Sequence, residues 1–423
     1  MIFIYKFLTF FFYPIFVLII FLRKLVNKEH KKRYKEKLFS YYFNPKKIKK
    51  KKLLWFHAAS VGEVQSIFPI IIELKKRNKK LEFLITTVTL SAGNLVQEKF
   101  SASSCVHHRY FPIDVDFLIK KFLNAWRPNL ILFVDSEIWP NLIFETKRRN
   151  IPSIIINGRI TKKSFRNWML LPQFSKKIFN KFSLCLTASK EAKKYFKDLN
   201  VRNVKYFGNL KLSSSTQLEK TKNFDKILIK NRIWCAASTH EGEELLCLKT
   251  HINLKKIYKN IVTILVPRHI NRISEIKKLC DELNLSSQIL NGKRDSIKNK
   301  NEIILINYFG GLPKYFHHAK SVFIGKSTLI NLKENSGQNP IEAAKLGCKI
   351  YHGPYVNNFK EIYELFNSLN ISEQIIDDRE LTKKLIIDLK SRKKNVNMIN
   401  RSLNKLGKNV LNKSIKEINK FIL

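Results

Sequence analysis

The sequence has few cysteines, and they do not cluster. No two of them form a C-x-x-C pair, so the pattern excludes a disulfide framework and a thiolate zinc site. Reduced, mostly buried thiols of a cytosolic domain are expected instead. The six cysteines are Cys105, Cys185, Cys235, Cys247, Cys280 and Cys348.

Common phosphate-loop and metal motifs are also absent. The chain has no G-x-x-x-x-G-K-[ST] sequence, and its one Gly-Gly pair, at 310–311, does not form a G-x-G-x-x-G fingerprint. The His-His pairs at 107–108 and 317–318 lack spaced Cys, Asp or Glu partners for zinc. Asp114-Val-Asp116 resembles a D-x-D metal motif, but a helix is expected to begin there, so we interpret it as capping.

Acidic residues are scarce: 33 Asp and Glu stand against 79 Lys and Arg, a formal net charge of +46. Such an excess suggests an anionic partner, although much of it is lysine scattered over every region. No RNP signature, zinc finger or compact basic helix is present, so no nucleic-acid partner is predicted. Basic stretches at 24–37 and 46–52 lie beside an apolar N-terminus. They favour a membrane surface with anionic lipids.

The N-terminal segment 1–22 is strongly apolar. Residues 7–22 carry no charge, Lys6 interrupts the run, and Pro14 is expected to kink it. Its length is marginal for a span, which needs ~20 apolar residues. No small-residue cleavage site follows, and the basic flank predicts a cytoplasmic side for the rest of the chain. We expect residues 1–24 to anchor the protein in the cell inner membrane, either as a single span or within one leaflet.

From residue 53 onward, short apolar runs alternate with amphipathic helices, a pattern typical of parallel α/β sheets. A hydrophobic content of 44% is enough for sizeable cores. We expect an N-terminal domain at 25–212, a polar linker at 213–230 and a C-terminal domain at 231–423. The expected strands are 53–58, 83–87, 130–134, 154–157 and 184–188, then 233–237, 262–266, 303–306, 321–324 and 349–352. The expected helices include 64–75, 115–125, 139–149, 190–197, 241–255 and 272–283.

Two carboxylate-bearing segments follow strands of the first domain. Glu63 ends a strand-and-turn sequence and lies in the first turn of a helix, at the edge where open α/β sheets bind ligands. Spacing alone favours a simpler role, a carboxylate that complements the helix dipole by ~0.3–1 kcal/mol. Asp135 and Glu137 follow the strand 130–134, and for them ligand binding and capping before Pro140 both stay open.

Two further segments lie in the second domain. Arg268 and His269 follow the strand 262–266, where a guanidinium could grip a phosphate or simply face solvent. In the run 336–344, Asn339 has the place of an N-cap, Pro340 that of the first helical residue, and Glu342 completes a capping-box spacing. A glycine-flanked helix start is also an anion site, and Glu342 could accept hydrogen bonds from a ribose.

Taken together and in order, eight blocks resemble the 3-deoxy-D-manno-octulosonic acid (Kdo) transferases of lipopolysaccharide assembly. The resemblance runs from the anchor to about residue 365. Each block is unspecific alone, and their order carries the signal. The blocks are HAASVGE at 57–63, DSEIWPNL at 135–142, GNLK at 208–211, ASTH at 237–240, PRH at 267–269, FGGLP at 309–313, GQNPIE at 337–342, and HGP at 352–354 with NF at 358–359.

The resemblance implies an α/β fold of the GT-B type, in which two Rossmann-like domains face each other across a cleft without a metal or cofactor. The first domain would take a lipid A precursor (lipid IVA) and the second CMP-Kdo. Glu63 would be the general base of an inverting transfer, and Asp135 and Lys211 would stabilise the transition state. The residues implied to hold CMP are Arg268, His269, Phe309, Gly310, Gly311, Asn339, Pro340, Ile341 and Glu342.

The chain departs from the family pattern at several places. Asp135 replaces a usual Glu, the run 309–311 replaces Met-Gly-Glu, and the loop 325–335 is more polar and less glycine-rich. We interpret these changes as lineage variation in an active enzyme. Two alternatives are another GT-B transferase that uses a UDP-sugar and a membrane lipid, and a basic membrane protein that binds nucleic acid. The second leaves the spacing of the blocks unexplained.

Overall fold

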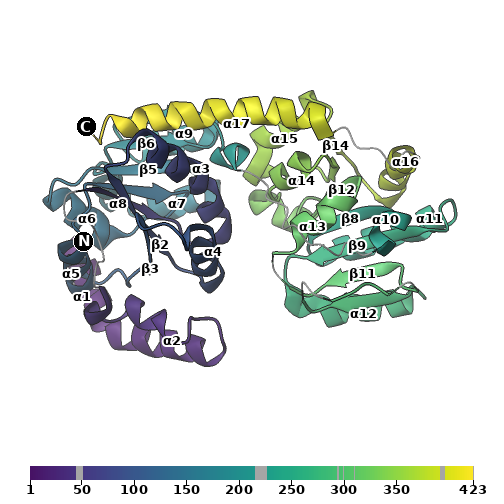
Figure 1. The fold of residues 1–423 in the computed structure, drawn as a ribbon, viewed down its shortest axis with the longest axis horizontal. Helices are drawn as coiled ribbons and strands as arrows, with labels where there is room; N and C mark the ends of the chain where they lie inside the picture. Colours follow the sequence, from purple (N-terminus) through teal and green to yellow (C-terminus); the bar gives the residue numbers. More distant parts are fainter. Residues whose placement is uncertain are drawn as a thin grey trace. The chain divides into compact units, whose positions relative to one another are not determined.

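The computed structural model describes residues 1–43, 51–214, 226–292, 295–298, 300–308, 310–390 and 396–422. The chain divides into two compact units, Met1–Ser214 with Leu406–Leu423 and Ser215–Lys405. Figure 1 labels the elements of both. Most of the expected linker 213–230 and of the basic stretch 46–52 lies outside the described residues.

Unit 1 is built on a parallel sheet of seven strands in the order β3-β2-β1-β4-β5-β6-β7. The strand order reverses between β1 and β4, which pair directly, and such a reversal is where open α/β sheets bind ligands. The strands are β1 Lys52–His57, β2 Leu81–Thr87, β3 Val106–Tyr110, β4 Leu130–Val134, β5 Ser153–Gly158, β6 Leu184–Thr187 and β7 Val204–Tyr206. The helices that follow them are α3 Val61–Arg77, α4 Leu90–Phe100, α5 Asp116–Trp126, α6 Pro140–Arg148, α7 Lys162–Met169, α8 Pro172–Phe179 and α9 Lys190–Asp198.

Helices cover both faces of this sheet, as the continuous apolar strands require. Phe56 of β1 packs in one core with side chains of α3 and α4. Trp55, its neighbour on the opposite face, packs in a second core with side chains of α5, α6, α8 and α9. Both aromatic side chains are fully buried. The two cores fix the register of the central strands and so the positions of the loops at their carboxyl ends.

Unit 2 repeats the architecture with a second parallel sheet, in the order β10-β11-β9-β8-β12-β13-β14. Its strands are β8 Arg232–Thr239, β9 Ile261–Pro267, β10 Ser287–Leu290, β11 Ile303–Ile306, β12 Ser321–Ile324, β13 Lys349–His352 and β14 Ser372–Gln374. Its helices are α10 Lys226–Lys230, α11 Glu243–Lys255, α12 Ile273–Glu282, α13 Leu312–His318, α14 Ile341–Lys345, α15 Lys360–Ser368 and α16 Asp378–Leu389. Side chains of α11, α12 and α16 form the core on one face of the sheet.

The apolar N-terminus forms two helices, α1 (Ile2–Phe11) and α2 (Tyr13–Leu25), with no buried side chain in either. They bend by 53° at a break beside Pro14, as the sequence predicted. Among the described residues, no single helix is long and apolar enough to cross a membrane, whereas this bent pair passes the test of length and composition. Polar side chains of α1 attach it to the rest of unit 1: Tyr5 Oη donates to Asp114 Oδ2 over 3.1 Å, and Lys6 Nζ lies 2.7 Å from Asp116 Oδ1.

Asp114 also caps a helix, which confirms the capping interpretation, although the helix is not the expected one. Its carboxylate accepts hydrogen bonds from the backbone N–H groups of Asn141 and Leu142, at 2.9 and 3.0 Å, in the first turn of α6. Asp116 is the first residue of α5. The two aspartates of the D-x-D pattern therefore connect α1 to the rest of unit 1, and Asp114 also caps the start of α6.

The ten expected strands are present, and the four that the sequence pattern missed (β3, β7, β10 and β14) are the outer strands of the two sheets. Edge strands face solvent on one side, so they carry polar residues such as His107, His108 and Arg109 in β3 and lack the apolar run that marks a central strand.

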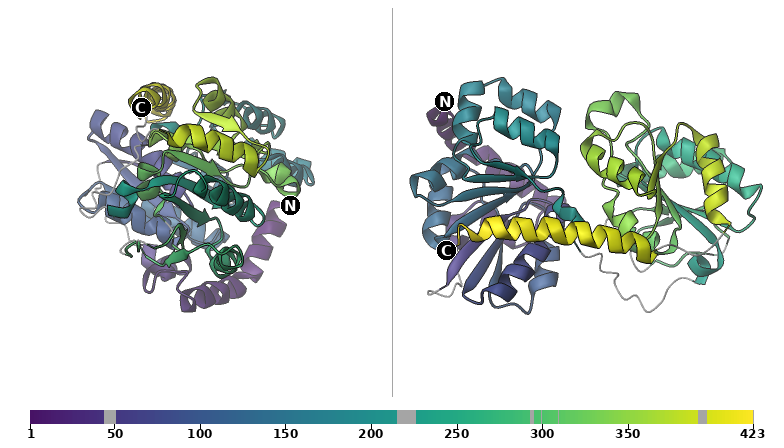
Figure 2. Two further views of the ribbon diagram at one scale, coloured as in Figure 1. Left: turned by 90° about the vertical axis from the view of Figure 1, so that its right-hand side faces the viewer. Right: turned by 90° about the horizontal axis from the view of Figure 1, so that it is seen from above.

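The last helix, α17 (Val396–Asn419), returns the chain to unit 1. Ile415 and Ile418 are fully buried in the unit 1 core, so the expected C-terminal domain, 231–423, runs too far: residues from Leu406 belong with the first unit. Figure 2 shows this helix in yellow. Gly407 brings it close to η3 (Leu210–Ser213), because a β-carbon there would collide with the carbonyl oxygen of Leu212.

We predict that Gly407→Ala destabilises the protein by ~1–3 kcal/mol, because overpacking against the Leu212 backbone outweighs the ~1 kcal/mol gain in helix propensity. The midpoint of thermal unfolding of the full chain measures this. Asn409→Ala, at an exposed position of the same helix, is the control and leaves the midpoint unchanged or raises it. An unchanged or higher midpoint for Gly407→Ala would contradict the close packing.

Candidate active site

Glu63 lies in the first turn of α3, directly after β1, as the sequence predicted. Its carboxylate accepts hydrogen bonds from the backbone N–H of Ala59, at 2.8 Å, and from the hydroxyl of Ser60, at 2.7 Å. Taken alone, these contacts are those of a capping carboxylate. What distinguishes Glu63 is its surroundings on the adjoining strand ends.

Asp135 and Lys211 meet beside it. Asp135 follows β4, and its Oδ2 lies 3.7 Å from Lys211 Nζ on η3 and 4.0 Å from Arg159 Nη1. Lys211 reaches the start of α3, since a β-carbon on Gly62 would lie 3.6 Å from its Nζ. The structure therefore brings together the three residues that the resemblance implied as catalytic, although Lys211 is 148 positions beyond Glu63 in the sequence.

Asn157, at the end of β5, holds this group in place. Its side-chain amide donates to Asp135 Oδ1, and its side-chain oxygen accepts from the backbone N–H of Leu210 over 2.8 Å. Asn157 and Asp135 both adopt left-handed backbone conformations, with φ of +53° and +56°, which asparagine and aspartate tolerate better than most residues. One buried amide thus joins the ends of β4 and β5 to the turn that carries Lys211.

Burial and charge raise the pKa of Glu63 from its ordinary value of 4.5 to about 7. Desolvation is the largest cause, followed by the negative charges of Asp135 and Glu137, while the hydrogen bonds from Ser60 and Ala59 oppose the rise. Burial lowers the pKa of the Lys211 ammonium, against the attraction of Asp135. A carboxylate with a pKa near neutrality can exchange a proton at physiological pH.

The sequence pattern missed a second network behind Glu63, centred on His57. The fully buried imidazole of His57 lies 3.3 Å from Glu137 Oε2 through Nε2 and 2.9 Å from the Thr86 hydroxyl through Nδ1. The Trp139 indole also donates to Glu137, at 3.1 Å. Burial alone would raise the pKa of Glu137, but the hydrogen bonds from His57 and Trp139 outweigh it and keep the pKa below its ordinary value. Glu137 therefore stays ionised. In the sequence, the only indication of this network was that His57 and Glu137 each belong to one of the family-like blocks.

Unit 2 carries cationic side chains at the carboxyl edge of its own sheet. Arg268 and His269 follow β9 and are exposed. The ring of His269 lies 5.5 Å, centroid to centroid, from that of His240, which follows β8. Lys326 follows β12, between those loops and the block 336–342, and its backbone oxygen accepts a hydrogen bond from the N–H of Gly337.

Glu243, a residue that sequence reasoning passed over, organises these loops. It is fully buried at the start of α11 and accepts hydrogen bonds from the loops after β8 and β12. The donors are the backbone N–H groups of His240, Lys326, Ser327 and Thr328 and the hydroxyl of Thr328. Its position three residues after His240 could have indicated this role, because a carboxylate that caps a helix start has that spacing.

The remaining residues implied for nucleotide binding lie at helix starts of unit 2. Gly310 has a φ of +86° and Gly311 precedes α13, while Phe309 lies outside the described residues. Asn339 accepts a hydrogen bond from Ile341 N–H over 3.2 Å. The helix α14 begins at Ile341, with Pro340 as its N-cap, so the predicted placement of Asn339 as N-cap and Pro340 as first residue was one position too early. Burial raises the pKa of Glu342, and the charge of Lys345 opposes this.

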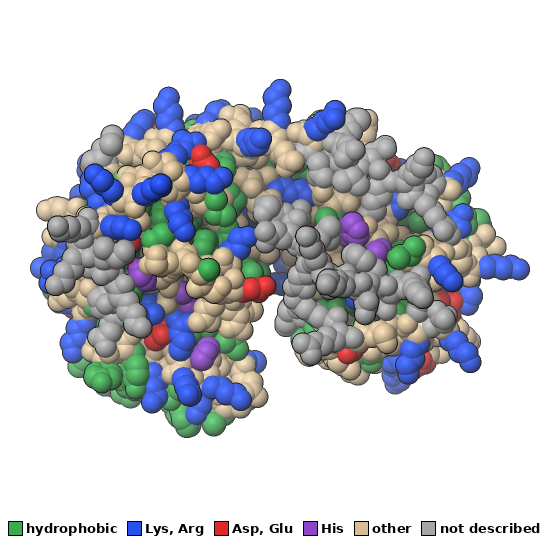
Figure 3. Space-filling model, viewed as in Figure 1, with side chains coloured by type: hydrophobic (Ala, Val, Ile, Leu, Met, Phe, Trp, Pro, Cys, Tyr) green, Lys and Arg blue, Asp and Glu red, His purple; other side chains and the backbone are tan. Residues whose placement is uncertain are grey.

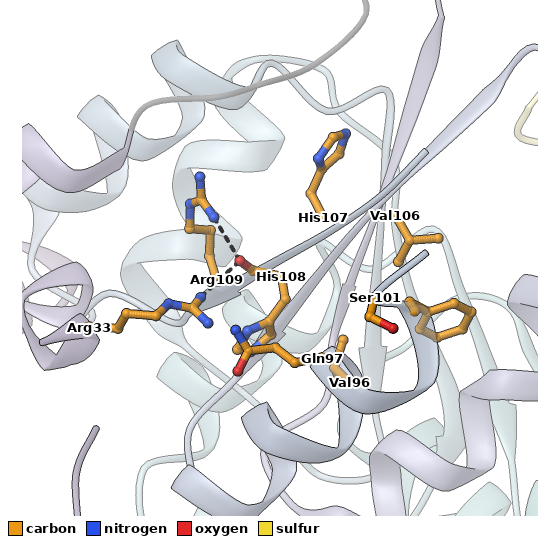
Figure 4. A pocket seen from close by; sticks show the side chains of 9 residues that line it. Arg33, Val96, Gln97, Ser101, Val106, His107, His108 and Arg109 are labelled. Atoms are coloured by element: carbon orange, nitrogen blue, oxygen red, sulfur yellow. Dashed lines mark hydrogen bonds between the residues drawn. The ribbon is translucent and has the colours of Figure 1, made fainter. Parts of the chain in front are cut away.

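A separate pocket of about 440 Å³ lies at the outer edge of the unit 1 sheet (Figure 4). The guanidinium groups of Arg33 and Arg109 both donate to the carbonyl oxygen of His108, at 3.0 and 2.9 Å. Burial and these two cations lower the pKa of His108 to about 3. The pocket does not include Glu63, and it lies beside η1 (Arg33–Lys37), which follows the N-terminal helices. Its polar lining is Arg33, Gln97, Ser101, His107, His108 and Arg109.

Comparison with known proteins decides the family. Residues 32–214 match the family model described as "3-Deoxy-D-manno-octulosonic-acid transferase (kdotransferase)". The 3-deoxy-D-manno-octulosonic acid transferase of Rickettsia bellii is 30% identical over 363 residues, which cover 85% of this chain and 84% of that protein. The chain belongs to the Kdo transferases. The probable mitochondrial Kdo transferase of Arabidopsis thaliana is also 30% identical, over 87% of this chain and 83% of that protein.

Solved structures agree on the fold of this Kdo transferase. The UDP-GlcNAc 2-epimerase of Neisseria meningitidis has a TM-score of 0.59 at 13% identity, and the match covers 88% of this chain and 99% of that one. At such low identity the likeness concerns the fold alone. Two parallel seven-stranded α/β sheets of the GT-B type are therefore shown, and the Kdo transferase is a glycosyltransferase.

We predict that Glu63 titrates near pH 7 in the folded protein, and that Glu137→Gln lowers this pKa because a nearby negative charge is removed. Carboxyl-carbon NMR of glutamate-labelled protein measures the titration, and Glu63→Gln assigns the resonance by its loss. Glu98→Gln, an exposed change on α4, is the control and leaves the titration as it was. A Glu63 pKa near 4.5 would contradict the burial argument.

The same pKa has a consequence for stability. Between about pH 4.5 and 7, folded Glu63 holds a proton that the unfolded chain has lost. Glu63 therefore makes a contribution to the free energy of unfolding that falls as the pH rises through this window. Unfolding of Glu63→Gln should show a shallower pH dependence there.

Proposed function

We propose that this Kdo transferase transfers Kdo from CMP-Kdo to a lipid A precursor, lipid IVA, in lipopolysaccharide core biosynthesis, with inversion at the anomeric carbon. The observation that carries the proposal is the meeting of Glu63, Asp135 and Lys211 at the carboxyl edge of the unit 1 sheet. Family membership supports the sugar, and this geometry supports the residues that act on it.

Glu63 is the general base of the proposed reaction. Its carboxylate takes the proton of an acceptor sugar hydroxyl while that oxygen forms a bond to the anomeric carbon of Kdo. The bond from the anomeric carbon to the phosphate oxygen breaks, and CMP leaves with the electron pair. A pKa of about 7 suits this step, because the base is then strong yet still largely available as carboxylate near neutral pH.

Asp135 and Lys211 stabilise the charges that develop in this step. Both side chains are largely buried, with 11% and 14% exposed, and charges act more strongly where water is excluded. Asp135 is one methylene shorter than the usual glutamate of the family. Asn157 donates a hydrogen bond to its carboxylate, and the Arg159 guanidinium lies 4.0 Å from it. These contacts fix the position of the Asp135 side chain, which supports a functional role for it.

Unit 2 binds CMP-Kdo in this proposal. Arg268 and His269 supply positive charge at the end of β9, and the loops at 310–311 and 339–342 supply backbone N–H groups. A UDP-sugar remains the alternative donor, and the assay below separates the two.

In this proposal, the N-terminal helices hold the enzyme on the cytoplasmic face of the inner membrane, where a lipid acceptor would reside. Figure 3 shows hydrophobic side chains over the part of unit 1 formed by α1 and α2, with Lys and Arg around them. The contacts of Tyr5 and Lys6 with unit 1 favour a pair of helices that lies in one leaflet over one that spans the bilayer. The arginines of the neighbouring pocket support contact with anionic headgroups.

We predict that the purified protein adds Kdo to a tetra-acylated lipid A precursor when CMP-Kdo is generated in situ, with the mass gain of the lipid read by mass spectrometry. No product forms with UDP-sugars. Glu63→Gln lowers kcat by ~10²–10⁴-fold, the usual loss for a general base, whereas the exposed control Glu98→Gln keeps it. In the wild type, kcat/KM rises with pH through about 7 as Glu63 loses its proton.

Each arm of this assay can fail separately. No mass gain with CMP-Kdo would overturn the proposed reaction. Near wild-type turnover by Glu63→Gln would remove the base and leave the transfer. Loss of activity on addition of EDTA would contradict a metal-independent reaction.

We predict that the full chain sediments with vesicles of phosphatidylcholine alone and with vesicles that also contain phosphatidylglycerol. Deletion of residues 1–22 removes the exposed apolar helices, so the truncated protein binds only the anionic vesicles and leaves them at high salt. Binding of the truncated protein to neutral vesicles at the wild-type level would contradict the anchoring role of α1 and α2.

A further inference from the structure

Lys326 has an unusual backbone conformation for a lysine. It follows Gly325 directly after β12, with a φ of +58°. This left-handed region costs free energy for any residue with a β-carbon and is normally occupied by glycine, asparagine or aspartate. Such strain persists where the surroundings impose it, and it is found preferentially at functional sites.

The surroundings of Lys326 do impose it, because its two backbone polar groups are fixed to different loops. Its N–H donates to Glu243 Oε2 over 2.6 Å, and its carbonyl oxygen accepts from the N–H of Gly337 over 2.6 Å. Gly325 leaves no room for adjustment, since a β-carbon there would lie 2.6 Å from both Glu243 and the backbone of Thr239. The point from which the lysine side chain extends is therefore set by the fold.

Lys326 has cationic neighbours that influence its charge or are influenced by it. Lys326 is half-buried, and burial, with the charge of Arg268, lowers the pKa of its ammonium. Arg268 is anchored beside it, since its N–H donates to the carbonyl oxygen of Thr239, one strand away. Burial also lowers the pKa of His240, and Lys326 and His269 add to this against the charge of Glu243.

No acid balances these two cations within the part of the chain that the structure describes. Neither the Lys326 ammonium nor the Arg268 guanidinium has an ion-pair partner there. Glu243 is the carboxylate closest in the hydrogen-bond network, and its oxygens already accept four backbone N–H groups from the loops after β8 and β12. Glu244, the next acid, pairs with Arg272 at 3.0 Å. Two cations held close together, one of them half-buried, favour an anionic ligand.

We propose that Lys326 is a phosphate-binding residue of the nucleotide site in unit 2, where it acts with Arg268 on the phosphate of the CMP moiety. The proposal deepens the proposed function and depends on it. Arg268 offers a planar fork and Lys326 a compact point charge, and a phosphate can accept from both. The strained backbone of Lys326 is then the cost of placing a lysine where the fold suits glycine.

Three variants of the full chain separate charge from strain. Lys326→Gly removes the charge and relieves the strain, while Lys326→Gln removes the charge and keeps the strain. Asn370→Gly is the matched control, because Asn370 is exposed in unit 2 with a φ of +55° and lies outside the residues assigned to the site. Binding of CMP and of cytidine is measured by calorimetry, and stability by thermal unfolding.

For both Lys326 variants, we expect the affinity for CMP to fall by about tenfold or more, the loss of one charge-assisted hydrogen bond, with the affinity for cytidine unchanged. Lys326→Gly and Asn370→Gly unfold at a higher temperature than the wild type, and Lys326→Gln does not. Asn370→Gly binds CMP as the wild type does. In turnover, the KM for CMP-Kdo rises in the Lys326 variants and kcat changes little.

Two outcomes overturn the proposal in distinguishable ways. If the wild type binds CMP and the Lys326 variants show the same preference for CMP over cytidine, Lys326 does not bind the phosphate and the proposed donor stands. If the wild type fails to bind CMP, the proposed donor is wrong and this role of Lys326 falls with it.

Discussion

Beyond the carboxyl ends of the strands in each parallel sheet, the backbone groups of the loops need new hydrogen-bond partners. The rest of this structure depends on which side chains provide them. In unit 1 the side chain of Asn157 accepts from the backbone N–H of Leu210 and donates to the Asp135 carboxylate, and Glu63 accepts from the backbone N–H of Ala59. In unit 2 the partner is Glu243, which gathers the loops after β8 and β12. Buried polar groups without partners are costly. Asn157 and Glu243 therefore each fix more than one loop at once, and candidate site residues are carried by those loops.

The two edges differ in which charged groups dominate them, although Lys211 and Arg159 also lie at the first. The unit 1 edge collects Glu63, Asp135 and Glu137, whose mutual repulsion and burial push the pKa of Glu63 upward. The unit 2 edge collects Arg268 and Lys326, with a buried carboxylate that is occupied by backbone donors. The first arrangement suits a group that accepts a proton, and the second suits a group that holds an anion. A transferase with an anionic nucleotide donor and a hydroxyl acceptor needs both.

Sequence patterns predicted the central strands and missed the outer ones for a single physical reason. A central strand of a parallel sheet is covered on both faces and becomes a continuous apolar run, as in β4, Leu130–Val134. An edge strand such as β3 is half-exposed and carries His107, His108 and Arg109. The N-terminal helices were predicted from the apolar run and Pro14, but their attachment through Tyr5 and Asp114 joins residues 109 positions apart. No local pattern reports such a contact.

The sequence by itself determined the family, the alternation of strands and helices, and the placement of Glu63 at a strand-to-helix turn, because these depend on local order and on blocks in series. Only the tertiary structure decided the pKa of Glu63, and with it whether this carboxylate can exchange a proton near neutral pH. By spacing alone it was a carboxylate that complements a helix dipole. Its pKa near 7 arises from desolvation and from the charges of Asp135 and Glu137 in the loop after β4, and both depend on distances that folding alone sets. The same holds for Lys211, Glu243 and Lys326, whose contacts lie between loops far apart in the chain.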